Sequence, residues 1–304
     1  MVKYFPFTPD FNLRMGTAPL PDNDSLLETD EHYLNEIQLK RSLLENNYAY
    51  YFAALPESQA AQWEAVDLVL DNLQRHDPEN FSVRRDSQVH FTNKRLDERF
   101  SFMMEQDRAV SLAPLDFVGR HVQEDLILLN PAGEVVAGQL CFPSGWALHE
   151  KLGKPFLEVH APLPRVVTPM IEAANKFLER FPVGKSFSRN NWGFRLGNQL
   201  DLSSQYSLTY RESLDQELPK MSRESFGEMI FLRVEHQTLT RLRRSNHILF
   251  TIHTYHSALQ EEASDRRRAQ TMLSFLKGAP ASLIEYKVMA PFYDSLMVYL
   301  SEMI

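Results

Sequence analysis

Residues 122–142, VQEDLILLNPAGEVVAGQLCF, decide the fold class of this chain. They contain two β-rich runs, 122–129 and 134–142. The Asn130-Pro131-Ala132-Gly133 segment between the runs has strong turn chemistry. We therefore predict a hairpin of two antiparallel strands here.

Two further runs downstream alternate between apolar and polar side chains, as a half-buried strand does. In 229–235 one predicted face carries Ile230, Leu232 and Val234, and the other carries Phe231, Arg233 and Glu235. The run 247–255 has the same pattern. A short strand is also expected over 156–160, before a Pro-rich bend.

Helical spacing of apolar residues predicts helices on both sides of these strands. The first is expected over 25–48, where Ser25 and Glu28 form a capping-box pattern. A second should follow Pro56 and end at Asp77-Pro78, because proline cannot continue the helical hydrogen bonds. Others are expected over 167–181 and at the C-terminus, whereas 201–226 is expected to be mainly a loop.

Helices at both ends of a largely antiparallel sheet define an α+β protein. The pattern shows no linker, so we expect one domain over 1–304. Within it, 1–110 would be a helical N-terminal part, 111–260 the sheet core and 261–304 the C-terminal helices.

Composition excludes several classes of function. Of the 304 residues, 32 are Lys or Arg and 40 are Asp or Glu, so the net charge is −8, opposite to that of a general nucleic-acid binder. The single cysteine, Cys141, excludes a disulfide framework or a multi-cysteine zinc site. No apolar run reaches the ~20 residues of a membrane span, and no secretory signal is evident. A cytoplasmic protein without nucleic-acid or membrane partners is therefore expected.

Residue patterns alone leave the chemistry open. Phosphate-binding glycine motifs, the GxSxG elbow and HExxH are all absent. His160 stands before a Pro-x-Pro bend that could aim it into a cavity, or it could be a structural histidine. Arg233 and Glu235 could line a polar pocket or an exposed face. A non-heme metal site of His247, His253 and Glu235 is disfavoured, because strand spacing of roughly 3.3 Å per residue separates the two histidines.

Six strings in order nevertheless resemble one family, the heme-dependent oxidative N-demethylases, in their heme-binding alpha subunit. The strings are QEDL (123–126), CFPSGW (141–146), KLGKP (151–155), VHAPLP (159–164), SRNNW (188–192) and LRVEHQTLTRL (232–242), which leads into ILFTIHTY (248–255).

This resemblance implies a PAS-like sheet that holds heme b through an axial histidine. It implies an O₂-dependent oxygenase that removes a methyl group from dimethylamine and releases formaldehyde. Electrons would come from NADPH through a separate reductase with flavin and [2Fe–2S] centres. The alternative is a non-catalytic PAS-type sensor or binding protein, since fold does not determine function.

The resemblance also suggests roles for individual residues. His160, in the VHAPLP string, is the expected iron ligand. Lys151, Arg189 and Arg241 would pair with the heme propionates. Arg233 and Glu235 would line the distal side, where the carboxylate would hold the substrate ammonium and the arginine would stabilise reduced dioxygen.

Two positions depart from the family pattern. His236 stands where arginine is usual, and Arg243 stands where proline is expected. The His236 change puts the identity of the substrate in doubt more than heme binding.

Overall fold

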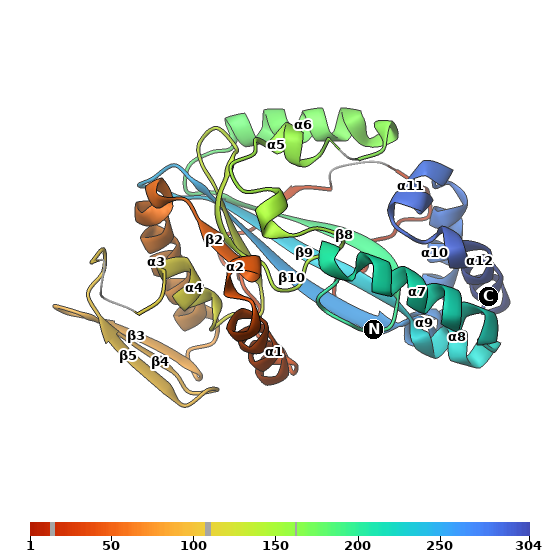
Figure 1. Ribbon diagram of the computed structural model, residues 1–304, viewed down its shortest axis with the longest axis horizontal. Coiled ribbons are helices and arrows are strands. Elements are labelled where there is room, and N and C mark those ends of the chain that lie inside the picture. Colours follow the sequence, from red (N-terminus) through yellow and green to blue (C-terminus); the bar gives the residue numbers. More distant parts are fainter. Residues whose placement is uncertain (13–15, 107–110, 162) are drawn as a thin grey trace.

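A long antiparallel sheet organises the molecule (Figure 1). The computed structural model describes residues 1–12, 16–106, 111–161 and 163–304. Seven strands of the described chain form this sheet, with all pairings between them antiparallel. Their order across the sheet is β1 (Ala18–Pro19), β8 (Ser186–Leu196), β9 (Ile230–Arg241), β10 (Ile248–Ala258), β6 (Asp125–Leu129), β7 (Val135–Gln139) and β2 (Phe52–Ala54).

The predicted hairpin is confirmed as β6 and β7. Asn130 closes the turn, because its side-chain oxygen accepts hydrogen bonds from the amides of Ala132 at 3.0 Å and Glu134 at 2.9 Å. Gly133 supplies the left-handed backbone conformation that the turn requires, at φ 84°. The turn therefore sets the register of the pair.

Helices occupy both ends of the sheet and one of its faces (Figure 1). One end carries α1 (Tyr33–Asn46), α2 (Tyr48–Tyr51), α3 (Gln59–His76), α4 (Pro114–Gly119) and a second sheet of β3 (Phe81–Arg85), β4 (Val89–Asn93) and β5 (Glu98–Phe102). The other end carries α7 (Ser207–Glu217), α8 (Arg223–Met229), α9 (Leu259–Ala263), α10 (Arg266–Lys277), α11 (Ala281–Tyr286) and α12 (Tyr293–Glu302). Between the two ends, α5 (Phe156–Val159) and α6 (Thr168–Arg180) lie over one face of the sheet.

The α+β class is confirmed: the protein mixes helix with a mostly antiparallel sheet. The helix after Pro56 is α3, which ends at His76 as Asp77-Pro78 predicts. The helices expected over 167–181 and near the C-terminus are α6 and α12. The finer, PAS-like description stays a prediction.

Three expectations were wrong. The first helix begins at Tyr33 rather than 25, because Ser25 bonds to Asn72 and Glu28 bonds to Lys3 instead of forming a capping box. The segment 156–160 is a helical turn, in which the Val159 amide bonds to the Pro155 carbonyl at 3.0 Å. The 201–226 region contains α7 and the start of α8 instead of a loop.

The alternating pattern of β9 is confirmed. Ile230, Leu232 and Val234 are fully buried in the cluster formed with the C-terminal helices. The opposite face carries Arg233 and Glu235, and this face lies toward the cavity described below. No helix within the described residues is long and apolar enough to cross a membrane.

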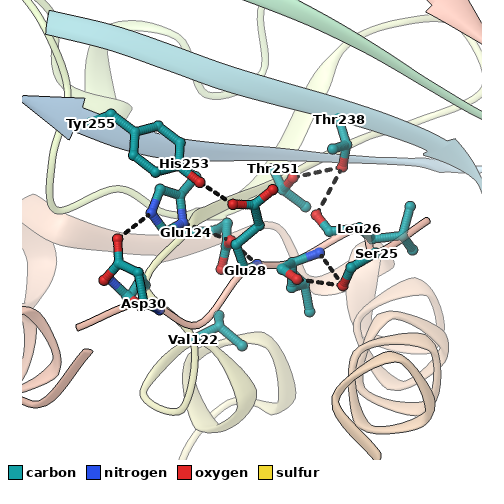
Figure 2. Close-up of polar contacts among 12 residues, drawn as sticks. Ser25, Leu26, Glu28, Asp30, Val122, Glu124, Thr238, Thr251, His253 and Tyr255 are labelled. Carbon is teal, nitrogen blue, oxygen red and sulfur yellow. Dashed lines mark hydrogen bonds and ion pairs between the residues drawn. The ribbon is translucent and has the colours of Figure 1, made fainter. Parts of the chain in front are cut away.

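A buried acidic network ties the segment before α1 to the sheet (Figure 2). His253 on β10 pairs with Glu124 at 2.9 Å and with Asp30 at 3.5 Å, and Tyr255 donates to Glu28. Burial alone would lower the pKa of His253, but hydrogen bonds and charges of Asp30 and Glu124 outweigh burial and raise it to about 10. The ring is therefore an imidazolium at neutral pH.

His253→Gln should lower the free energy of unfolding at pH 7 by about 3 to 5 kcal/mol, because it leaves buried Glu124 without its cation. The folded-state pKa of His253 exceeds its unfolded value, so its contribution is complete below about pH 6.5 and is lost as pH rises through about 10. Urea unfolding between pH 6 and 10 measures both effects. Exposed His32→Gln is the matched control, and equal stability of the two variants would contradict the assignment.

Candidate functional site

The register of three strands gathers charged and polar side chains on one sheet face. Asn191 on β8 pairs with Glu235 on β9, which pairs with Thr254 on β10. Two residues along, Gly193 pairs with Arg233. Because side chains alternate between faces along a strand, Arg233 and Glu235 project to the same side.

A cavity of about 250 Å³ opens over this face. Its lining comes from β8, β9, the loops near 144 and 202, the start of α7, and the segment after α11. The charged side chains in the lining are Arg195, Arg211, Arg233, Glu235 and Lys287.

Arg233 and Glu235 are held by different kinds of partner. Arg233 is 2% exposed and donates to the carbonyls of Phe142 at 2.5 Å and Leu200 at 2.9 Å. Glu235 accepts hydrogen bonds from Asn191 at 3.1 Å and Gln237 at 3.0 Å, and its Oε1 lies 3.8 Å from Arg233 Nε. Burial lowers the pKa of Arg233 to about 10, which still leaves it a cation at neutral pH.

Lys287 enters the cavity from the turn after α11. Its Nζ donates to the Trp192 carbonyl at 2.5 Å and to Asn191 Oδ1 at 3.3 Å. Burial, followed by the charge of Arg195, lowers the pKa of Lys287 to about 7. The next residue, Val288, has φ 56°, an unfavourable conformation for a β-branched side chain. Asn191 thus links the amine of Lys287 to the carboxylate of Glu235.

His160 lies at the end of the helical turn α5. Its Nδ1 lies 2.7 Å from the Phe156 carbonyl, which can only accept, so Nδ1 carries the proton. Burial, with the charges of Lys151 and Arg189, lowers the pKa of His160. The ring is therefore neutral at pH 7, and Nε2 has no hydrogen-bond partner among the described residues.

The three residues predicted to pair with the heme propionates do not all lie near His160. Lys151 donates to the Val159 carbonyl at 2.8 Å, beside His160. Arg189 has a buried Nε without a partner in the described structure, and it interacts electrostatically with both His160 and Glu235. Arg241 lies apart from them, where it donates to the Leu178 carbonyl at the end of α6 and to Asn246.

These surroundings fit a heme. A neutral imidazole with Nδ1 fixed by a carbonyl is the usual form of a histidine ligand to iron. The partly buried side chains of Phe156, Phe177 and Phe187 offer flat apolar contacts, and unpartnered Arg189 Nε can meet a carboxylate. Among the described residues no cluster of three metal-ligating side chains exists, but an axial heme site needs only one. Pro162 of the VHAPLP string lies outside the described residues.

The strand faces also bear on two other sequence hypotheses. His253 projects to the face opposite Glu235 and lies between two carboxylates, so the geometry does not support a metal site shared by these residues. His236 shares that opposite face, where it stacks on Tyr4 with centroids 3.8 Å apart. His236, which stands where the family pattern has arginine, is therefore outside the lining of this cavity.

Sequence reasoning missed Arg195 and Lys287. Arg195 follows the quoted SRNNW string, but β8 itself was not expected, because its polar residues hide the alternation. Lys287 has no local signal, because its place in the cavity depends on hydrogen bonds to Asn191 and Trp192 on β8, which are distant in the chain.

The fold and site thus define a mixed helix-and-sheet protein with a histidine suited to heme and with a polar cavity, and Arg189 interacts electrostatically with both His160 and Glu235 of the cavity lining. The family model described as "Haem-dependent oxidative N-demethylase, alpha subunit-like" matches residues 17–297. The chain belongs to this family, as the sequence strings predicted. The family description indicates heme dependence and an oxidoreductase of the N-demethylase type, and the term alpha subunit implies a partner subunit.

Lys287 should titrate near pH 7, because burial and Arg195 disfavour its charged form. In protein labelled with [ε-¹³C]lysine, one Cε signal should shift with a midpoint near pH 7. Lys287→Met should remove this signal, whereas exposed Lys277→Met should retain it. Absence of a signal that titrates near neutrality would contradict the placement of Lys287.

Proposed function

We propose that this protein is the heme-binding subunit of an oxygenase that removes a methyl group from a small amine such as dimethylamine. The observation that carries the proposal is His160, a neutral imidazole whose Nδ1 is fixed and whose Nε2 has no hydrogen-bond partner among the residues that the structure describes. Family membership supports it independently. His160 would hold the iron, and Lys151 and Arg189, which lie near it, would pair with the propionates. Arg241, the third predicted partner, would have to leave Leu178 and Asn246 to join them.

Heme b, when bound, would supply the activation of O₂, with electrons from NADPH through a separate flavin and [2Fe–2S] reductase. The reaction balances as (CH₃)₂NH + O₂ + 2 e⁻ + 2 H⁺ → CH₃NH₂ + HCHO + H₂O. The methyl carbon is oxidised to formaldehyde, the C–N bond breaks, and O₂ is fully reduced. The protein must therefore bind an ammonium group, stabilise developing negative charge and supply protons.

The cavity side chains suit these three tasks. Glu235 carries the negative charge that an ammonium group needs. Arg233 remains cationic at neutral pH and can stabilise negative charge that develops beside it. Lys287, whose pKa is about 7, can hold or release a proton at Nζ.

His160→Ala should abolish the Soret band of the reconstituted protein or weaken heme binding at least about 10-fold, because the ligand to iron is lost. Addition of imidazole should restore the band in His160→Gly. His149→Ala, an exposed histidine of the same region, is the control. A wild-type protein that takes up no heme, or His160 variants with an unchanged spectrum, would refute the proposal.

Glu235→Gln should lower kcat/KM for amine demethylation about 10²-fold, because loss of one partner from a partly buried charge pair costs about 3 kcal/mol. Heme binding should be unchanged. Formaldehyde release by the heme-loaded protein with a reductant measures the effect, and exposed Glu179→Gln is the control. Heme-loaded wild-type protein that binds amines but releases no formaldehyde would favour the sensor alternative.

A further inference from the structure

The charges that line the cavity do not balance. Among the described lining residues, Glu235 is the one carboxylate, whereas Arg195, Arg211, Arg233 and Lys287 are cationic groups. Even with Lys287 neutral, the arginines outnumber the carboxylate. A simple ammonium ion would therefore meet one attractive charge and several repulsive ones.

Within the described part of the chain, the one salt bridge that these cations form is that of Arg233 with Glu235 in the same cavity. Arg195 donates to the carbonyls of Phe194 at 2.8 Å and Lys287 at 2.6 Å, and to the Ser144 hydroxyl at 3.0 Å. Arg233 is bound mainly by carbonyls, and its buried Nε lacks a hydrogen-bond partner in the described chain. Cations set in protein in excess of carboxylates are costly, so this cavity suits a bound molecule that carries an anionic group.

The position of Arg195 shows where that anion would lie. A Cβ on Gly193 would come within 3.0 Å of Arg195 Nη1, so the guanidinium folds back over Gly193. Gly193 pairs with Arg233, and the next pair on the same face is Asn191 with Glu235. Two residues along a strand span roughly 7 Å. The cationic end and the carboxylate end of the cavity are therefore close neighbours.

We propose that the amine that fits this cavity carries its own carboxylate, so that the preferred substrate class is a small N-methylated α-amino acid. Its ammonium group pairs with Glu235, and its carboxylate lies against the guanidinium of Arg195. Such a molecule is the right length for the separation of roughly 7 Å between neighbouring residue pairs on this face. It would form one hydrogen bond of roughly 2.8 Å at its ammonium and one at its carboxylate, with the short N–Cα–C backbone between them. The volume of about 250 Å³ restricts the side chain to a small one.

This inference rests on the proposed function, which supplies the demethylation chemistry. The balance given for dimethylamine applies unchanged: N-methylglycine would yield glycine, formaldehyde and water, and its carboxylate takes no part. A guanidinium group binds a carboxylate in preference to a hydroxyl or methyl group, because the guanidinium and the carboxylate form charge-assisted hydrogen bonds.

The test is calorimetric titration of the heme-loaded protein with N,N-dimethylglycine and with dimethylamine at one pH and salt concentration. Wild type should bind N,N-dimethylglycine at least about 10-fold more tightly. Arg195→Gln should lose this preference, because the carboxylate of N,N-dimethylglycine loses its guanidinium partner. Arg267→Gln, an exposed arginine on α10, should behave as wild type.

A wild-type preference for dimethylamine would overturn this inference even if Arg195→Gln failed to fold. Weaker heme binding by Arg195→Gln would also overturn it, because the carboxylate at Arg195 would then be a heme propionate. Formaldehyde release is measured separately with both amines. If neither amine releases formaldehyde, the proposed function fails; if dimethylamine alone is bound and demethylated, only the present inference fails.

Discussion

The register of the β8–β9–β10 ladder is the constraint on which the rest of the structure depends. Ile230, Leu232 and Val234 are buried against the C-terminal helices, and each such side chain contributes about 1.5 to 3 kcal/mol. A slip of one residue would expose all three and drive Arg233 and Glu235 into that apolar core. Hydrophobic burial on one face therefore dictates where the charged side chains of the other face lie.

The cavity face is held by side-chain contacts to backbone carbonyls rather than by packing. Arg233 ties the carbonyls of Phe142 and Leu200 to the sheet, and Arg195 does the same for Lys287. Each contact joins a loop to a strand, so the cavity is assembled from segments distant in sequence. The left-handed backbone of Val288 and the burial of the cations lower the free energy of unfolding. The apolar clusters on either side of this region offset that loss.

The two faces of the same strands have opposite electrostatic character. On one face, carboxylates surround His253 and keep it protonated; on the other, arginines and Lys287 surround Glu235. This separation explains why His253 could not join Glu235 in a metal site, although both lie on neighbouring strands. It also places His236, the departure from the family pattern, away from the cavity.

The sequence by itself determined the 122–142 hairpin, the alternation of β9 and β10, the helices α3 and α6, and the family, because periodicity, turn chemistry and motif order are local properties of the chain. It also pointed to His160, Arg233 and Glu235 as candidates, whose roles stay predictions. Only the tertiary structure decided that 156–160 forms a helical turn and that Lys287 reaches Asn191. Both depend on packing between segments distant in the chain, and such contacts leave no periodic signal in either segment alone.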